Sequence, residues 1–180
     1  TLKKLASAKD IDVCVIPILE DSQGRMSSSR IRSALGQGDL IGAKNLMGRP
    51  FRFMGRVVSG RGIGRGLGWP TANLQVDGRK FLPGLGVYSA WAWINNKKEK
   101  FSAVMNLGPQ PTVDPKSPSA VEVHLLDKEI DLQGCELTIQ PVKRLRCQKC
   151  FSSLDELSKQ ISSDADLARD ELNFLKANEN

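Results

Sequence analysis

Short segments in which apolar residues recur at every second position fill the sequence from residue 51 onwards, and this alternation limits the possible folds more than any other feature. The segments run over residues 51–57, 86–94, 101–107, 120–126 and 135–145. Turn-forming residues separate them, and no long helical pattern lies between them. Because a period of two is typical of half-buried β-strands, the pattern predicts an antiparallel β-barrel or β-sandwich.

A helical region is expected after the last strand. Apolar residues recur at helical spacing over residues 154–175, after Ser153 and Glu156, which have the spacing of a capping box. Asp164 is expected to cap a second helical segment after a break at residues 162–163.

The part before the strands has a different pattern. Residues 11–19 form a nearly continuous apolar run with many β-branched residues, which predicts a strand buried on both faces of a parallel α/β sheet. Residues 27–47 begin with serines suited to N-capping and predict two short helices. Stop signals at residues 48–50 then predict a boundary. We therefore expect an α/β part over 1–48 and a β-domain over 49–180.

The composition is that of a folded protein. The chain has 180 residues, of which 40% are hydrophobic, and a net charge of +6. No apolar run reaches the roughly 20 residues needed to span a bilayer, so we expect a soluble, cytoplasmic protein without a membrane partner. The positive charge fits a nucleic acid, an anionic ligand such as a nucleotide, or only a basic solvated surface.

The four cysteines offer little for a metal or redox site. Only Cys147 and Cys150 lie close together, and the other cysteines and the single histidine lack the spacing of zinc ligands. We interpret the cysteines as ordinary reduced thiols.

A glycine-rich stretch follows the first strand. Its glycines are Gly60, Gly62, Gly64, Gly66 and Gly68. Glycine lets a backbone approach a ligand closely, so successive N–H groups, with Arg61 and Arg65 between them, are suited to cradle phosphate oxygens. A flexible linker or a bulged strand is the alternative, since the stretch matches neither the Walker nor the dinucleotide motif.

Thr71 and Asn73 directly follow the glycines. In an extended segment, side chains two residues apart point to the same side, so the hydroxyl and the amide oxygen are suited to Mg²⁺ together with substrate phosphates. A simple turn is the alternative interpretation.

One strand carries a candidate general base. In residues 120–126 the apolar side chains alternate with Glu122 and His124, which therefore share the opposite face. If that face lines a cleft, Glu122 is placed to accept a proton from a substrate hydroxyl. Otherwise both residues are solvated. His124 is the poorer candidate for a base, and we expect it to be either exposed or held by a structural hydrogen bond.

Taken in order, these segments resemble the riboflavin kinase family. The resemblance rests on GRPFRFMGRVVSG, GWPTANL, GVYSAWAWI, AVMNLGPQPTV, AVEVHLL and DLQGCELTIQPVKRLR, followed by the terminal helix. It implies a six-stranded antiparallel Greek-key β-barrel with a C-terminal helix. It also implies phosphorylation of riboflavin to FMN with ATP and Mg²⁺.

The resemblance also implies roles for individual residues. The glycine loop would hold ATP, with Thr71 and Asn73 as Mg²⁺ or nucleotide ligands and Glu122 as the base. Arg146 and the C-terminal helix would close over the flavin. The loop at Pro109 and Gln110 departs from the family pattern.

The first 48 residues resemble a second domain. The sequence SSSRIR at residues 27–32 is similar to a phosphate-contacting motif of the FMN adenylyltransferase domain that precedes the kinase in bifunctional enzymes. Ser28, Ser29 and Arg32 would then be the remnant of a second nucleotide site. The histidine motif of that domain is not in this sequence, so we expect this chain to lack FAD synthesis and to have lost an N-terminal adenylyltransferase domain in cis.

Two other functions remain open on the sequence alone. A basic β-barrel that binds single-stranded nucleic acid would use Trp69, Trp91 or Trp93 as stacking platforms and the basic residues 142–146 as a phosphate contact. A flavin-binding module without turnover is the other. The nucleic-acid function is not favoured, because the tryptophans on the strand are expected to face the core and the arginines do not interleave with aromatics. A test for FMN formation separates the flavin-binding module from the kinase.

Overall fold

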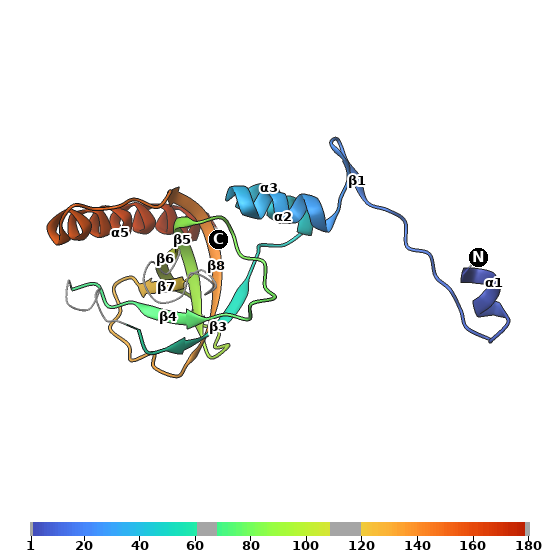
Figure 1. The fold of residues 1–180 in the computed structure, drawn as a ribbon, viewed down its shortest axis with the longest axis horizontal. Helices are drawn as coiled ribbons and strands as arrows, with labels where there is room; N and C mark the ends of the chain where they lie inside the picture. Colours follow the sequence, from blue (N-terminus) through green and yellow to red (C-terminus); the bar gives the residue numbers. More distant parts are fainter. Residues whose placement is uncertain (1, 61–67, 109–119, 179–180) are drawn as a thin grey trace.

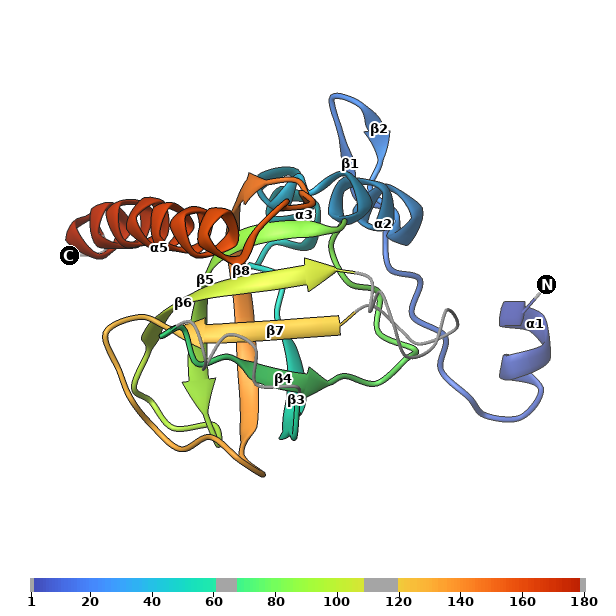
Figure 2. The ribbon, with the colours of Figure 1, turned by 60° about the vertical axis from the view of Figure 1, so that its left-hand side comes forward.

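Six antiparallel strands close into a barrel in the order β3-β4-β7-β6-β5-β8 (Figure 2). The structure is a computed structural model that describes residues 2–60, 68–108 and 120–178. The strands are β3 (Phe53–Val58), β4 (Ala72–Gln75), β5 (Gly86–Ile94), β6 (Phe101–Gly108), β7 (Ala120–Leu125) and β8 (Glu136–Arg146). The predicted six-stranded antiparallel barrel is confirmed.

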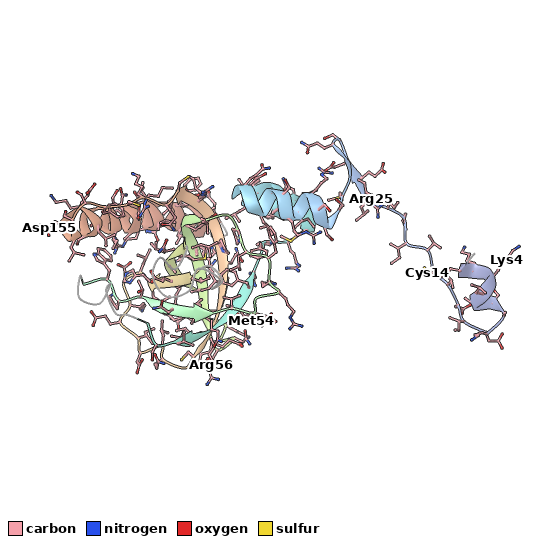
Figure 3. The ribbon with its side chains drawn as sticks, viewed as in Figure 1. Lys4, Cys14, Arg25, Met54, Arg56 and Asp155 are labelled. Atoms are coloured by element: carbon pink, nitrogen blue, oxygen red, sulfur yellow. The ribbon has the colours of Figure 1, made fainter. Side chains whose placement is uncertain are left out.

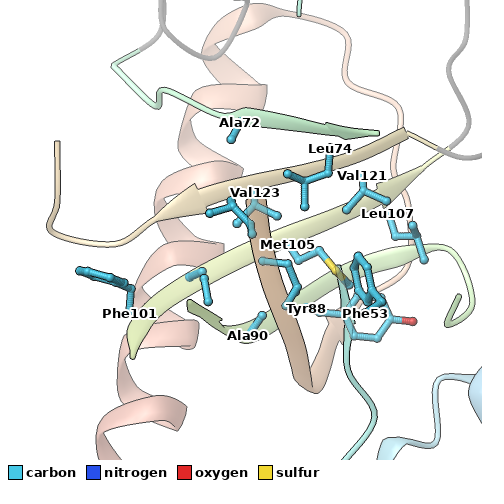
Figure 4. Close-up of a cluster of buried hydrophobic side chains, with 14 of the residues drawn as sticks. Phe53, Ala72, Leu74, Tyr88, Ala90, Phe101, Met105, Leu107, Val121 and Val123 are labelled. Atoms are coloured by element: carbon cyan, nitrogen blue, oxygen red, sulfur yellow. The ribbon is translucent and has the colours of Figure 1, made fainter. Parts of the chain in front are cut away.

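The alternation in the sequence fills the inside of the barrel. Figure 4 shows side chains from several strands meeting there, including Phe53, Tyr88, Met105, Val121 and Val123. These five side chains are almost fully buried. Burying each large apolar side chain contributes about 1.5–3 kcal/mol, so this cluster is the main stabilising feature of the barrel.

A long helix, α5 (Leu154–Ala177), covers one outer wall of the barrel (Figure 1). Its buried Ala165, Ala168 and Leu172 pack against Trp91 of β5, which is 2% exposed. The sequence pattern predicted that Trp91 faces the core of the barrel. Trp91 instead lies outside the barrel interior, under α5. Tyr88, on the other face of the same strand, enters the interior, because β5 is buried on both of its faces.

The helix begins as predicted but does not break. Ser153 is the N-cap, and its hydroxyl accepts a hydrogen bond from the Glu156 N–H at 3.2 Å. The expected break at residues 162–163 is wrong, because α5 continues through them. Asp164 is not a cap but a buried carboxylate that pairs with Arg146 of β8.

The two predicted short helices are present as α2 (Ser28–Gln37) and α3 (Leu40–Met47). Gly38 and Gly48 end them in the left-handed conformation that glycine adopts easily. Leu35 belongs to the same buried cluster as the barrel interior, and the Gly84 N–H donates to its carbonyl oxygen at 2.9 Å. The helices therefore dock on the barrel, and a domain boundary at residue 48 stays a prediction.

The first residues run away from the barrel. They form α1 (Leu2–Ser7) and a small hairpin of β1 (Glu20–Asp21) and β2 (Gly24–Arg25). The predicted buried strand over residues 11–19 is wrong, since these residues form no strand and Ile16 is 82% exposed. A strand buried on both faces needs neighbouring strands, and the described part of the chain places none beside it. Figure 3 shows the segment around Cys14 standing apart from the barrel.

Candidate active site

A row of polar side chains crosses three neighbouring strands on the outside of the barrel. In the register of the sheet, Asn73 of β4 lies opposite Glu122 of β7, and Glu122 lies opposite Asn106 of β6. We call Asn73, Glu122 and Asn106 the polar row. It faces outwards because Val121 and Val123, on either side of Glu122, are buried in the interior.

The Glu122 carboxylate has a defined partner in this row. The Asn106 side-chain N–H donates to Glu122 Oε2 at 3.4 Å. All three side chains are partly buried, so they remain open to a ligand while their neighbours restrict their motion. The two-residue period in the sequence predicted the face of Glu122. It did not predict Asn106, because strand register is a long-range property.

A fourth polar residue reaches the row from beyond β8. The Gln148 side-chain N–H groups donate to Asn106 Oδ1 at 2.7 Å and to the Leu107 carbonyl oxygen at 2.9 Å. No pattern in the sequence indicates this contact, since Gln148 and Asn106 are 42 residues apart.

The glycine stretch begins beside Asn73. A Cβ atom on Gly60 would lie 1.9 Å from Asn73 Nδ2, so a larger residue at position 60 would displace this amide from its present position. Thr71 is exposed immediately before β4. The remaining predicted phosphate-binding residues lie outside the described residues: Arg61, Gly62, Gly64, Arg65 and Gly66.

His124 holds the segment that carries Thr71. Its Nδ1–H donates to the Pro70 carbonyl oxygen at 2.8 Å, and its ring packs edge-on against Trp69 with centroids 5.3 Å apart. Of the two expectations for His124, the structure therefore shows the structural hydrogen bond, which restrains the segment before β4.

A pocket of about 430 Å³ lies between the segment after β8 and the start of α5. Its lining residues are Lys149, Cys150, Phe151, Glu156, Lys159, Gln160 and Ser163. Hydrogen bonds from the Ser152 hydroxyl and N–H lower the pKa of Glu156, so this carboxylate stays ionised above mildly acidic pH.

Arg146 lies beside this pocket and forms an ion pair with Asp164 of α5. Its guanidinium donates to both carboxylate oxygens of Asp164, at 2.9 and 2.8 Å, and the two side chains are only 15% and 4% exposed. Gln160, which lines the pocket, donates to the same carboxylate at 3.0 Å. The guanidinium also lies 5.7 Å from the Phe151 ring centroid. Arg146 is thus placed beside the pocket, with most of its donors engaged within the protein.

The residues expected from a second nucleotide site lie elsewhere. Ser28, Ser29 and Arg32 are exposed on the first turns of α2. The helix is capped by Ser27, whose hydroxyl accepts from the Arg30 N–H at 3.4 Å. Ser28, Ser29 and Arg32 are therefore not part of the polar row, whose residues lie on β4, β6 and β7.

The donors near the polar row suit one kind of metal ion. Within the described residues, no group of three or more His, Cys, Asp or Glu side chains could hold a metal. Cys147 and Cys150 are free and exposed. Thr71, Asn73 and Glu122 carry hard oxygen donors of the kind that Mg²⁺ prefers, and the register of the sheet places Asn73 opposite Glu122.

The stacking surface needed for nucleic-acid binding is not supported. Trp91 is buried under α5, and the Arg52 guanidinium covers Trp93 at 4.5 Å from the ring centroid. In the basic segment, Lys143 pairs with Glu171 and Arg146 with Asp164. Over residues 142–146 the described strands give β8 one partner, β5, because its pairing with β3 covers only Glu136 to Ile139.

The fold is a closed β-barrel domain that carries a carboxylate between two amides on its outer face, and comparison with known proteins identifies its family. The model of the riboflavin kinase family matches residues 47–172. The chain therefore belongs to the riboflavin kinase family, the enzymes that phosphorylate riboflavin to FMN.

Curated relatives are named bifunctional riboflavin kinase/FMN adenylyltransferases. The Pseudomonas fluorescens protein is 40% identical over 145 residues, which cover 81% of this chain and 46% of that protein. The Escherichia coli K12 protein is 38% identical over 84% of this chain and 48% of its own length. The chain thus spans about half the length of the curated relatives that it matches.

Solved structures agree on the fold. A Streptococcus pneumoniae structure described as a macrolide-efflux protein aligns with a TM-score of 0.78 and 32% identity over 94% of this chain and 55% of that chain. A riboflavin kinase from Trypanosoma brucei aligns with a TM-score of 0.50 and 24% identity over 69% of this chain and 78% of that chain. Among the described residues, no helix combines the length and the apolarity needed to cross a membrane.

Proposed function

We propose that the polar row is the site at which this chain transfers the terminal phosphoryl group of ATP to the end hydroxyl of the riboflavin ribityl chain. The hydroxyl oxygen forms the new bond to phosphorus, the bond from phosphorus to the bridging oxygen breaks, and ADP leaves. Glu122 accepts the hydroxyl proton. The observation that carries this proposal is the position of Glu122 between Asn73 and Asn106 on an outer face of the barrel that α5 does not cover.

Thr71 and Asn73 would hold Mg²⁺ together with the phosphates of ATP. When bound, Mg²⁺ neutralises negative charge on the phosphates, which is the chemistry such a transfer requires. The fit is supported by Gly60, which leaves space against Asn73. The protein's own contribution is then to position the hydroxyl and the phosphate and to remove one proton.

The pocket beside α5 is the candidate site for the flavin. Its volume of about 430 Å³ falls within the usual range for small-molecule sites. Phe151 offers an aromatic surface, while Lys149 and Lys159 offer hydrogen-bond donors. Arg146, predicted to bind flavin, would act indirectly. It pairs with Asp164, and Asp164 accepts a hydrogen bond from the pocket residue Gln160.

One experiment tests the proposed reaction directly. The chain is incubated with riboflavin, ATP and Mg²⁺, and the flavins are separated by chromatography. FMN should form in proportion to enzyme and time, and omission of Mg²⁺ should prevent it. Binding of riboflavin without any FMN would instead identify a flavin-binding module without turnover.

The bifunctional relatives motivate a second proposal about a longer protein. Ser28, Ser29 and Arg32 would contribute to an adenylyltransferase site that also needs residues outside this chain, in a protein that converts FMN to FAD. The exposed first turn of α2 supports this, since a helix N-terminus favours phosphate. Incubated with FMN and ATP, this chain alone should yield no FAD.

A further inference from the structure

We propose that Gln148 is a positioning residue for the phosphoryl transfer, and that it acts by orienting the Asn106 amide toward Glu122. This inference rests on the proposed function of the polar row. It assigns a role to a segment beyond β8 in setting the geometry of the base.

The argument begins with the asymmetry of an amide. Asn106 can present either its NH₂ group or its oxygen to Glu122, and the two orientations have nearly the same shape. Only the NH₂ group forms a favourable contact with a carboxylate. Gln148 selects this orientation, because its N–H donates to Asn106 Oδ1 at 2.7 Å and therefore requires the oxygen to face away from Glu122.

The position of Gln148 is itself fixed. Its Nε2 has a second acceptor, the Leu107 carbonyl oxygen at 2.9 Å, so both of its N–H groups are used. A Cβ atom on Gly108 would lie 2.9 Å from Nε2, so glycine at this position leaves room for the Gln148 amide. Gln148 thus donates to Asn106, and Asn106 donates to Glu122, in a continuous chain of hydrogen bonds.

This arrangement also connects the base to the candidate flavin pocket. Lys149, the first residue lining the pocket, directly follows Gln148. The backbone segment that forms one wall of the pocket therefore also sets the orientation of the carboxylate. In such a site, a displacement of about 1 Å can cost about 100-fold in rate.

A purely structural role for Gln148 makes a different prediction. If its bond to Leu107 only joins the segment after β8 to β6, the effect of removing Gln148 does not depend on Asn106. If Gln148 acts through Asn106, its effect disappears once Asn106 is gone. A double-mutant cycle separates the two roles.

The variants are Gln148→Ala, Asn106→Ala and the double variant, with Gln140→Ala as the matched control. Gln140 is a glutamine on β8 whose side-chain oxygen accepts a hydrogen bond from Arg52, away from the polar row. We expect Gln148→Ala and Asn106→Ala each to lower kcat for FMN formation about 10- to 100-fold, with both KM values within about twofold. The double variant should be no slower than Asn106→Ala, and Gln140→Ala should be unchanged.

A second substitution tests the direction of the hydrogen bond. Gln148→Glu keeps the shape but cannot donate to Asn106 Oδ1, so the amide should turn its oxygen toward Glu122. We expect Gln148→Glu to be slower than Gln148→Ala, although glutamate is the closer isostere. Asn106→Ser replaces Asn106→Ala in the cycle if the alanine variant does not fold.

Two results would overturn the inference. One is wild-type kcat in Gln148→Ala, and the other is a loss in the double variant equal to the product of the two single losses. Absence of FMN formation by the wild-type chain has a different meaning, because it contradicts the proposed function itself.

Discussion

Two walls of one barrel differ in what lies over them. The outer face of β4, β7 and part of β6 carries the polar row and is not covered by α5, whereas the outer face of β5, the rest of β6 and part of β8 lies under α5. We call the first the open wall and the second the covered wall. On β6 the change occurs within two residues, since Val104 packs against the helix-covered cluster and Asn106 faces Glu122. The helix therefore covers the wall that contributes to stability and leaves the wall with the proposed catalytic residues outside its contact area.

This difference predicts which residues determine the turnover rate and which determine the stability of the domain. Side chains on the open wall contact few apolar neighbours, so their removal should affect turnover more than folding. Side chains on the covered wall, such as Trp91 and Leu172, are buried and should affect folding more than turnover. Each prediction below tests one side of this division.

The largest effect is expected on the open wall. Glu122→Gln should lower kcat for FMN formation about 10²- to 10⁴-fold, because an amide cannot accept the hydroxyl proton. Riboflavin binding and the thermal unfolding midpoint should stay near wild type. Steady-state kinetics measures kcat, and titration and scanning calorimetry measure riboflavin binding and the unfolding midpoint. Glu136→Gln, at the first residue of β8 beside Asn96, is the control. Wild-type turnover in Glu122→Gln would remove Glu122 from the mechanism.

The covered wall should respond in the opposite way. Leu172→Ala should lower the free energy of unfolding by about 2–5 kcal/mol, since it opens a cavity between α5 and β5. The folded fraction should keep near-wild-type kcat. Urea unfolding checks the first expectation, and Leu167→Ala, at a position 51% exposed on the same helix, is the matched control. If Leu172→Ala slows turnover without losing stability, the division between the walls fails.

A smaller effect is expected for the proposed metal ligands. Thr71→Ala and Asn73→Ala should each raise the Mg²⁺ concentration needed for half-maximal rate about 10-fold, because each removes one oxygen donor. Titration of the rate with Mg²⁺ at saturating ATP measures this. Thr138→Ala, which removes a hydroxyl from the opposite side of the barrel, should leave the titration unchanged. An unshifted titration in both ligand variants argues against metal binding there.

The smallest effect concerns the interior, which belongs to neither wall. Burial raises the pKa of the Tyr88 hydroxyl, which donates to the Gly84 carbonyl oxygen. A raised pKa means that the folded state favours the neutral form, so this stabilisation is present below pH about 10 and is lost as the pH rises above it.

Tyr88→Phe should therefore cost about 1 kcal/mol of unfolding free energy at neutral pH, through the lost hydrogen bond. The difference between the variant and the wild type should shrink above pH about 10. Chemical unfolding from pH 7 to 11 provides the test, and a constant difference across that range would contradict the assigned pKa direction.

Local patterns were enough to predict much of the fold. The two-residue period predicted five of the barrel strands and the inward face of Val121 and Val123, because side-chain direction in a strand depends only on position parity. Capping residues likewise predicted the starts of α2 and α5. The expectation for residues 11–19 failed, because apolar composition does not supply the partner strands that a buried strand needs.

The site divides in the same way. The sequence by itself determined that Glu122 and His124 share one face, and that Thr71 and Asn73 lie near the glycines. Only the tertiary structure decided that Asn106 and Gln148 meet Glu122, that Asp164 pairs with Arg146 and that Trp91 lies under α5. These contacts depend on strand register and on where a helix docks, and both are set by packing between residues far apart in the chain.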